Sequence, residues 1–201
     1  MKPPSTVDFF YDFASPYACL SALRIRPLAR AAQVGLRWRP FLLGPIFRAE
    51  GLGDSPFNVY PLRGAYARVD VARRARRYGF EVRFPSSFPR HSVLVSRVAL
   101  VALAEGWGEV LSEAVFRAEF QADADVSSLE VVGELVRGLG KDSERVLAAA
   151  QTPAVKAALR SQTEAAQGAG IFGAPSFLIE GELFWGDDRL EEALDSARGR
   201  A

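Results

Sequence analysis

Two short stretches of the sequence hold the residues best placed to do chemistry. Ser15 follows the apolar run Val7 to Phe13 and precedes Pro16, where a helix is expected to begin. The hydroxyl of such an N-cap serine lies where free N–H groups and the positive end of the helix dipole converge, a location suited to stabilising an anion. The second stretch places Ala174 and Pro175 before another apolar run near the C-terminus.

Cys19 is the natural rival to Ser15 as a nucleophile. It is the only cysteine, so the chain cannot form an intramolecular disulfide. On a helix it is rotated by about 100° from Ala18, so it should miss the opening of a site at the helix start. We therefore expect Cys19 to be a small buried core residue.

Three further patterns favour ordinary structural roles. Residues 168–173 match G-x-G-x-x-G but follow a helix and precede a strand, the reverse of the nucleotide-binding order. Ser15 and His91 could join an aspartate in a hydrolase triad, but no G-x-S-x-G turn exists. The basic run on the predicted helix that starts at Leu62 indicates a solvated face rather than a nucleic-acid surface. Its members are Arg68, Arg73, Arg74, Arg76 and Arg77.

The composition is that of a globular protein with one sizeable core. The 201 residues are 49% hydrophobic and 11% aromatic, and 25 basic against 24 acidic residues leave a net charge of +1. This balance gives no long-range attraction to nucleic acid or an anionic membrane. One cysteine and one histidine exclude a cysteine-rich zinc site or multi-histidine metal centre. The N-terminus lacks the apolar stretch of a secretory signal, and no segment has ~20 uninterrupted apolar residues, so we expect a cytoplasmic protein.

The N-terminal part predicts a strand, a helix and a second strand. The first strand covers residues 6–13, and the helix runs from Pro16 through Gln33, kinked by Pro27 and ended by Gly35. Residues 36–40 form the second strand, where apolar residues alternate with two arginines.

The long middle part, residues 42–168, predicts an all-helical block. Residues 41–61 are rich in Gly and Pro and predict irregular or short helical structure. Asp142 and Thr152 are expected N-caps, and the apolar helix 92–105 is expected in the middle of the bundle. The expected helices cover residues 62–78, 92–105, 108–121, 128–137, 143–151 and 153–167.

The C-terminal part returns to strands. Residues 176–180 and 183–185 predict a hairpin joined at Gly181 and Glu182. Asp187 or Asp188 is expected to cap a final helix, with Glu191 at capping-box spacing from Asp188. The chain is thus predicted as an α/β protein with a βαβ…ββα domain, residues 1–41 and 169–201, that carries a helical insertion at 42–168.

This order of elements is similar to that of thioredoxin-like proteins. Compared with that fold, Ser15 stands at the position of the first cysteine of a Cys-x-x-Cys pair, and Ala18 stands at the position of the second. Pro175 matches a proline that typically forms a cis peptide bond. We therefore expect the architecture of a thiol-handling site in which both cysteines are replaced. The sulfur must come from another molecule, for which glutathione is the obvious candidate.

Residues 8–17, 173–177 and 184–190 together resemble the bacterial 2-hydroxychromene-2-carboxylate isomerases. These are relatives of the kappa-class glutathione transferases and the DsbA-type thiol oxidoreductases. The resemblance covers about Val7 to Ala197. It implies a homodimer that uses glutathione to interconvert 2-hydroxychromene-2-carboxylate and trans-o-hydroxybenzylidenepyruvate in aromatic catabolism.

The resemblance also implies roles for single residues. Ser15 matches the serine that hydrogen-bonds the glutathione sulfur. Ala174, before Pro175, matches the residue whose backbone pairs with the cysteinyl part. Asp187 and Asp188 match the pair that receives the γ-glutamyl end, where an aspartate can accept from the ammonium group.

Three positions differ from the family's usual residues. Asp54 and Arg63 stand where relatives commonly carry asparagine and lysine; both remain candidate glutathione contacts, and arginine keeps the positive charge. His91 stands where asparagine is expected, and the sequence offers no explanation for it.

Other functions remain open on the sequence. A kappa-type glutathione transferase or peroxidase would leave the thiolate on its product. A non-catalytic glutathione or peptide binder would show binding without turnover. A disulfide oxidoreductase is the weakest alternative, because the necessary pair of thiols is missing.

Overall fold

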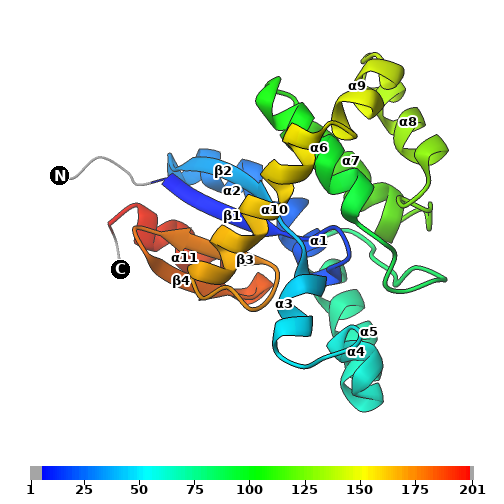
Figure 1. The fold of residues 1–201 in the computed structure, drawn as a ribbon. Helices are drawn as coiled ribbons and strands as arrows, with labels where there is room; N and C mark the ends of the chain where they lie inside the picture. The colour runs from blue at the N-terminus through cyan, green and yellow to red at the C-terminus, as the bar shows by residue number, and fades with distance from the viewer. Residues whose placement is uncertain (1–5, 200–201) are drawn as a thin grey trace.

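The structure, a computed structural model, describes residues 6–199. Its centre is a four-stranded sheet with the order β2-β1-β3-β4 (Figure 1). The strands are β1 (Thr6–Tyr11), β2 (Gly35–Pro40), β3 (Ser176–Ile179) and β4 (Glu182–Trp185). β2 pairs with β1 in parallel, whereas β3 is antiparallel to β1 and β4 is antiparallel to β3. The thioredoxin-like arrangement predicted from the sequence is therefore confirmed.

The first predicted helix is two helices, α1 (Pro16–Ala22) and α2 (Ile25–Ala32). The break lies at Arg24, earlier than the predicted kink at Pro27. A proline has no N–H, and its ring clashes with the carbonyl four residues before it, here that of Leu23. The chain therefore starts a new helix, and Pro27 falls in its first turn, where no donor is needed.

The end of α2 also differs from the prediction. Gln33 takes the left-handed conformation, with φ of 57°, and its N–H donates to the carbonyl of Arg30. Gly35 is already the first residue of β2. The conformation expected of a glycine is thus adopted by a glutamine.

Between β2 and β3, the elements of the described chain are helices, as predicted. They are α3 (Leu43–Ala49), α4 (Pro56–Val59), α5 (Pro61–Arg77), α6 (Val93–Ala104), α7 (Gly108–Phe120), α8 (Leu129–Gly138), α9 (Ser143–Ala150) and α10 (Pro153–Gly168). Asp142 and Thr152 cap α9 and α10 through their side chains, as expected. α6 packs against α7, α9 and α10, which confirms its central position.

The two faces of the sheet are covered by different helices. Phe9 and Tyr11 of β1 belong to the main core, together with residues of α1, α2 and the C-terminal helix α11 (Leu190–Ala197). Phe10 points to the other face, into a smaller core with residues of α3 and α10. In Figure 1, α6 to α9 gather beyond one end of the sheet, while α4 and α5 project separately.

The C-terminal hairpin is present, but its turn consists of Glu180 and Gly181, with φ of 51° and 92°. The turn was predicted at Gly181 and Glu182, one residue further along the chain. The final helix is preceded by the 3-10 turn η1 (Asp187–Arg189), and Arg189 is its N-cap residue without a side-chain cap bond. The predicted capping box of Asp188 is therefore wrong, because η1 moves the start of α11 beyond it.

No helix within residues 6–199 combines the length and apolar character needed to cross a membrane. The predicted domain boundaries, 1–41 and 169–201 around an insertion at 42–168, stay a prediction.

Candidate functional site

Ser15 is the N-cap residue of α1. Its backbone is extended, with φ of −94° and ψ of 115°, and its hydroxyl accepts a 3.2 Å hydrogen bond from the N–H of Ala18. Pro16 occupies the first helical turn, where its missing N–H costs nothing. The side chain is 6% exposed. The predicted cap is confirmed, and it places a hydroxyl at the positive end of the helix.

Asp12 holds the loop that presents Ser15. One carboxylate oxygen accepts from the N–H of Ala14 at 3.0 Å, and the other accepts from the N–H of Leu43 at 2.7 Å. The Asp12 carbonyl also accepts from the N–H of Ser15. Burial raises the pKa of Asp12. Sequence reasoning missed this residue, although an acid between a buried strand and a helix start is a usable signal for such a turn.

The loop before β3 meets the start of α1. The Ser15 hydroxyl donates a 2.8 Å hydrogen bond to the carbonyl of Ala174, and the Ala174–Pro175 peptide bond is cis. The Pro175 carbonyl accepts from the N–H of Gly186, which places the following aspartates beside the same loop. The structure thus brings Ser15, Ala174 and Pro175 together as the sequence predicted.

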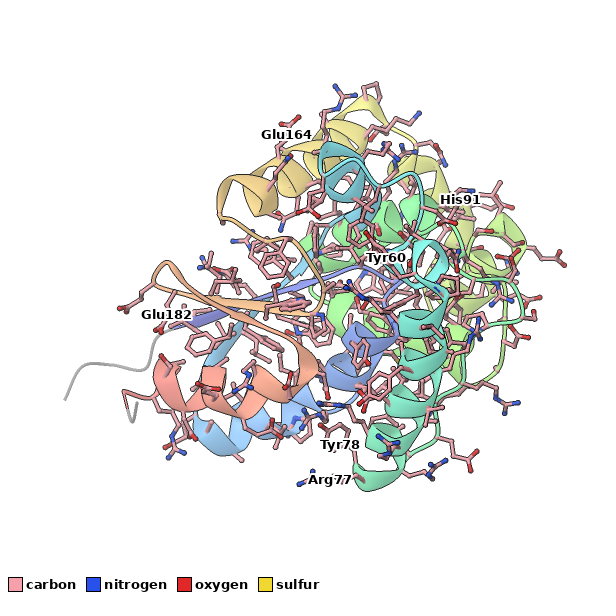
Figure 2. The ribbon with its side chains drawn as sticks, turned by 90° about the horizontal axis from the view of Figure 1, so that it is seen from below. Tyr60, Arg77, Tyr78, His91, Glu164 and Glu182 are labelled. Carbon is pink, nitrogen blue, oxygen red and sulfur yellow. The ribbon has the colours of Figure 1, made fainter. Side chains whose placement is uncertain are left out.

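Asp187 lies inside a network of buried donors. Its carboxylate accepts from the Ser21 hydroxyl at 3.0 Å and from Arg24 at 3.1 Å on one oxygen. The other oxygen accepts from Arg74 at 3.1 Å and from Tyr78 at 2.9 Å. Tyr78, labelled in Figure 2, is the residue that directly follows α5, and the Arg24 guanidinium lies 3.8 Å from the centre of its ring. Asp187 is 1% exposed, and the four donors occupy the acceptor sites of its carboxylate. These bonds join α1, the start of α2, α5 and η1.

Asp188 is in a different position from its neighbour. Its side chain is 47% exposed, and its nearest cations, Arg74 and Arg189, lie at 3.8 Å and 3.6 Å. Of the predicted pair, only Asp188 offers a carboxylate to a ligand in solution.

Asp54 and Arg63 lie on the α4–α5 side of the molecule. Asp54 is exposed and accepts from its neighbour Ser55 and from the side-chain amide of Asn58 at 2.9 Å. Arg63 is exposed, and its guanidinium lies 4.7 Å from the centre of the Tyr60 ring. No hydrogen bond or ion pair links either residue to Ser15 within the described chain.

Tyr17 connects the start of α1 with α4 and α5. Its hydroxyl donates to Asp70 at 3.0 Å, and its ring lies 6.3 Å from that of Phe57. Partial burial and the bond to Asp70 raise its pKa. Tyr17 is therefore a neutral aromatic side chain held in one orientation two residues after Ser15.

The rival residues are not arranged for catalysis. Cys19 is fully buried, and burial raises its pKa well above the ordinary range, so the predicted core role is confirmed. His91 is exposed at the surface (Figure 2), and the partners of the Ser15 hydroxyl in the described chain are Ala18 and Ala174. Among residues 6–199, no three His, Cys, Asp or Glu side chains form a group that could hold a metal ion.

Comparisons with known proteins agree with this architecture. Residues 6–197 match the family described as the DSBA-like thioredoxin domain. A solved structure of a 2-hydroxychromene-2-carboxylate isomerase is similar with a TM-score of 0.87 and 27% identity, covering 97% of this chain and 95% of that one.

Two curated relatives show the same relationship in their sequences. The 2-hydroxychromene-2-carboxylate isomerase of Sphingobium xenophagum is 27% identical over 187 residues, 92% of this chain and 94% of the relative. Glutathione S-transferase kappa 1 of Homo sapiens is 26% identical, over 94% of this chain and 88% of the relative. The resemblance drawn from the sequence motifs is confirmed.

Proposed function

The chain belongs to the DSBA-like thioredoxin family, and we propose that within it the protein is a glutathione-dependent isomerase that interconverts 2-hydroxychromene-2-carboxylate and trans-o-hydroxybenzylidenepyruvate. Relatives that carry this isomerase name, at 27–29% identity over more than nine-tenths of the chain, support the proposal. The observation that carries it is the Ser15 hydroxyl at the start of α1, hydrogen-bonded to the loop of Pro175, in a chain with no accessible thiol.

The residues around Ser15 fit a bound glutathione. The Ser15 hydroxyl has one hydrogen, which it gives to Ala174, so it can stabilise a ligand sulfur only by exchanging that bond. The Ala174 carbonyl would then need another donor, and the amide N–H of a peptide ligand is suitable. This exchange keeps every polar group of the loop satisfied, as partly buried groups require.

The chain also offers residues that can pair with the charged ends of glutathione. Asp188 can accept from the γ-glutamyl ammonium group, whereas Asp187 has no acceptor position left. We therefore assign this contact to Asp188 alone and a structural role to Asp187. Arg63 can face the glycyl carboxylate, because within the described residues it forms no ion pair. Asp54 is already bonded to Asn58, so it is better suited to support that side chain than to contact an anion.

The chromene is a cyclic hemiketal, so its ring C2–O bond must first open to the phenol and the 2-oxo acid, which conjugates the cis double bond with a ketone. That double bond must then lose its π character temporarily, because a cis alkene cannot otherwise rotate to trans. When bound, glutathione supplies a thiolate that adds reversibly to a conjugated enone. Ser15 and the N–H groups at the start of α1 lower the free energy of the negative charge on sulfur. Tyr17 provides an aromatic wall that is fixed by Asp70. The protein thus contributes charge stabilisation and orientation.

A kappa-type glutathione transferase is the second candidate, and the human relative at 26% identity favours it. In that reaction the sulfur stays bonded to the product, so glutathione is consumed in proportion to turnover. A chlorodinitrobenzene-type electrophile reports this reaction directly. A disulfide oxidoreductase is disfavoured, because Cys19 is buried and has no partner.

The test compares isomerisation of 2-hydroxychromene-2-carboxylate with and without glutathione, with total free thiol measured before and after. We expect turnover only with glutathione and no loss of free thiol. Equal rates without glutathione would contradict the proposal, and stoichiometric loss of thiol would support the transferase. Thermal stabilisation by glutathione without turnover of either substrate would identify a binding protein.

We also propose that the protein is a homodimer and works in the cytoplasm, where glutathione is kept reduced. An exposed apolar stripe on α5 supports the dimer: Leu62, Tyr66 and Val69 are 87%, 61% and 55% exposed, on the side opposite the buried Ala67 and Val71. Light scattering is expected to give twice the mass of the chain, and Leu62→Asp to reduce it to the monomer. A monomeric wild-type protein would contradict this.

A further inference from the structure

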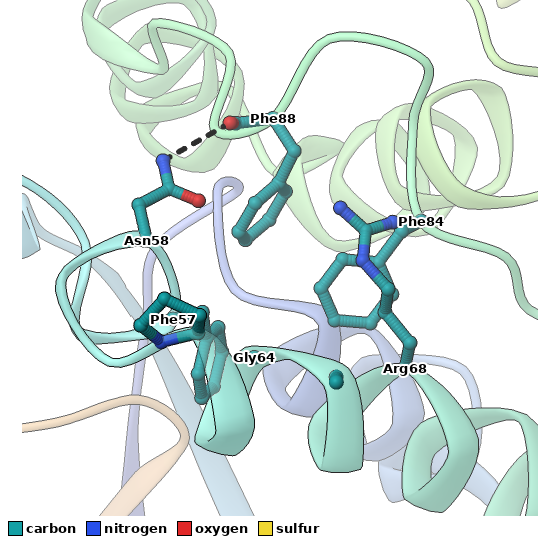
Figure 3. Close-up of a pocket in the computed structure, with 8 residues that line it drawn as sticks. Phe57, Asn58, Gly64, Arg68, Phe84 and Phe88 are labelled. Carbon is teal, nitrogen blue, oxygen red and sulfur yellow. Dashed lines mark hydrogen bonds between the residues drawn. The ribbon is translucent and has the colours of Figure 1, made fainter.

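A cavity of about 370 Å³ lies between α4, α5 and the segment that leads to α6 (Figure 3). Its volume is at the lower end of the range for small-molecule sites, which suits a ligand with one aromatic ring. Most of its wall is apolar. It is lined by Phe57, Asn58, Pro61, Gly64, Ala65, Arg68, Phe84 and Phe88.

The wall of the cavity is built by close packing of three aromatic rings. A Cβ at Gly64 would lie 2.1 Å from the carbonyl oxygen of Phe57, so only glycine lets α4 approach α5 this closely. The rings of Phe57 and Phe88 are stacked 6.3 Å apart, and Phe84 lies 4.8 Å from Phe88. The Phe57 ring in turn lies 6.3 Å from the ring of Tyr17, so the cavity adjoins α1, the helix capped by Ser15.

Arg68 supplies an unpaired cation at this aromatic wall. Its guanidinium lies 4.5 Å from the centre of the Phe84 ring, and it forms no ion pair within residues 6–199. Stacking on the ring leaves the N–H groups at the edge of the guanidinium free. A planar guanidinium held in this way can bind a carboxylate through two parallel hydrogen bonds.

Asn58 supplies the opposite kind of group, a free acceptor. Its amide nitrogen donates to Asp54 at 2.9 Å and to the Phe88 carbonyl at 3.3 Å, the latter shown as the dashed line in Figure 3. Both amide hydrogens are therefore used, while the side-chain oxygen accepts no hydrogen bond within the described residues. That oxygen can accept from a hydroxyl group of a ligand.

From these groups we infer that the cavity is the binding site for the substrate, and that it selects a planar aromatic ring carrying a carboxylate side chain and a ring hydroxyl. Arg68 binds the carboxylate, the oxygen of Asn58 accepts from the hydroxyl, and the three phenylalanines hold the ring. The inference rests on the proposed function, because it names the residues that recognise the proposed substrate, in a cavity whose Phe57 ring lies 6.3 Å from the ring of Tyr17. A neutral aromatic electrophile would leave Arg68 unpaired and bind more weakly.

The test measures binding calorimetrically in the absence of glutathione, so that no turnover is needed. The probe is 2-hydroxycinnamate, compared with its carboxamide and with cinnamate, which lacks the hydroxyl. For the wild type we expect the acid to bind about tenfold more tightly than the amide, and more tightly than cinnamate, as charge-assisted and neutral hydrogen bonds predict. Binding of acid and amide with equal affinity would overturn the inference.

Two matched variants locate the effect. Arg68→Met should bind the acid about tenfold more weakly than wild type and lose the preference over the amide. Arg76→Met should change neither value, because Arg76 is exposed on the same helix and forms no ion pair with any residue from 6 to 199. Equal losses in both variants, or none in Arg68→Met, would overturn the assignment. If the acid binds as expected but 2-hydroxychromene-2-carboxylate is not turned over with glutathione, the proposed function fails while the cavity assignment stands. If turnover is present and Arg68→Met leaves KM unchanged, the cavity assignment fails.

Discussion

The hydroxyl of Ser15 donates to the carbonyl oxygen of Ala174 across 2.8 Å, although 159 positions separate the two residues in the chain. This bond joins the start of α1 to the loop before β3, the two segments that a peptide ligand would contact at once. Because Ser15 has one hydrogen to give, a ligand sulfur and Ala174 compete for it. The bond joins the two halves of the candidate site, and in the function that we propose a bound ligand sulfur would replace Ala174 as the acceptor from Ser15.

Ser15→Ala should reduce isomerisation about 100-fold, since the hydrogen bond to the sulfur is lost. Loss of the N-cap should also lower the free energy of unfolding by about 1 kcal/mol. Ser128→Ala is the matched control, because Ser128 caps α8 through its bond to the N–H of Glu130. It should cost similar stability and leave turnover unchanged. Equal turnover in both variants would show that Ser15 is only a cap.

Asp187→Asn and Asp188→Asn should affect different properties, the first mainly stability and the second mainly glutathione binding. Asp187 pairs with Arg24 and Arg74 while almost fully buried, so Asp187→Asn should lower the free energy of unfolding by about 3 kcal/mol. Asp188→Asn should change it by less than about 0.5 kcal/mol but weaken glutathione binding about tenfold. Urea unfolding and calorimetry measure the two quantities. A destabilised Asp188→Asn with normal glutathione binding would refute this division of roles.

Gly173→Ala should disturb the loop that carries Ala174. An added Cβ would lie 2.2 Å from the indole nitrogen of Trp185, so the ring must move. We expect a loss of about 1 to 3 kcal/mol in unfolding free energy and a change in tryptophan fluorescence, because Trp185 is 53% exposed while Trp38 and Trp107 are buried. Gly168→Ala is the control, since nothing lies within 4 Å of its Cβ. Identical fluorescence in wild type and Gly173→Ala would contradict the close contact.

Stability should fall as the pH rises from about 4.5 to 7, and Glu119 should contribute to this fall. Glu119 is 1% exposed, and burial raises its pKa to about 7 in spite of the nearby Arg90. Within this window the folded protein keeps a proton that the unfolded chain has lost, so stability decreases with pH by at most about 1.4 kcal/mol per unit. Glu119 therefore does not lower stability at a pH below its pKa in the unfolded chain. Its full destabilising effect is reached at a pH above its pKa in the folded protein.

Glu119→Gln tests this assignment, because it removes the titrating group and keeps the shape. Denaturant midpoints measured from pH 4.5 to 8 should decline less steeply in this variant than in the wild type. The buried Asp12, whose pKa is also raised, should account for part of the decline that remains. The same slope in both proteins would contradict the role of Glu119.

The parts of the fold that depend on local chemistry were predictable from the sequence. The cap at Ser15, the proline after it and the caps at Asp142 and Thr152 all involve bonds within three residues. The order of strands and helices followed from hydrophobic periodicity in the same way. The errors were also local, since Pro27 lies in the first turn of a new helix rather than bending one long helix, and Glu180 takes a conformation expected of glycine.

The parts of the site that depend on tertiary contacts were not predictable. The donors to Asp187 include Ser21 and Tyr78, which are 166 and 109 positions away, so no pattern near residue 187 shows that its carboxylate is satisfied. The cavity of Phe57, Phe84 and Phe88 likewise forms only when α4 packs beside the segment before α6. The sequence shows the phenylalanines but not that they face one another.

The central claim, that the start of α1 stabilises a sulfur anion brought by glutathione, is tested most directly by titrating the thiol of bound glutathione. Thiolate formation can be followed by ultraviolet absorbance while the pH is changed, in wild type and Ser15→Ala. Our account predicts a pKa clearly below the ordinary thiol value of about 8.5 in the wild type and a value closer to it in Ser15→Ala. An unshifted pKa in the wild-type complex, or the same shift in both proteins, would contradict it.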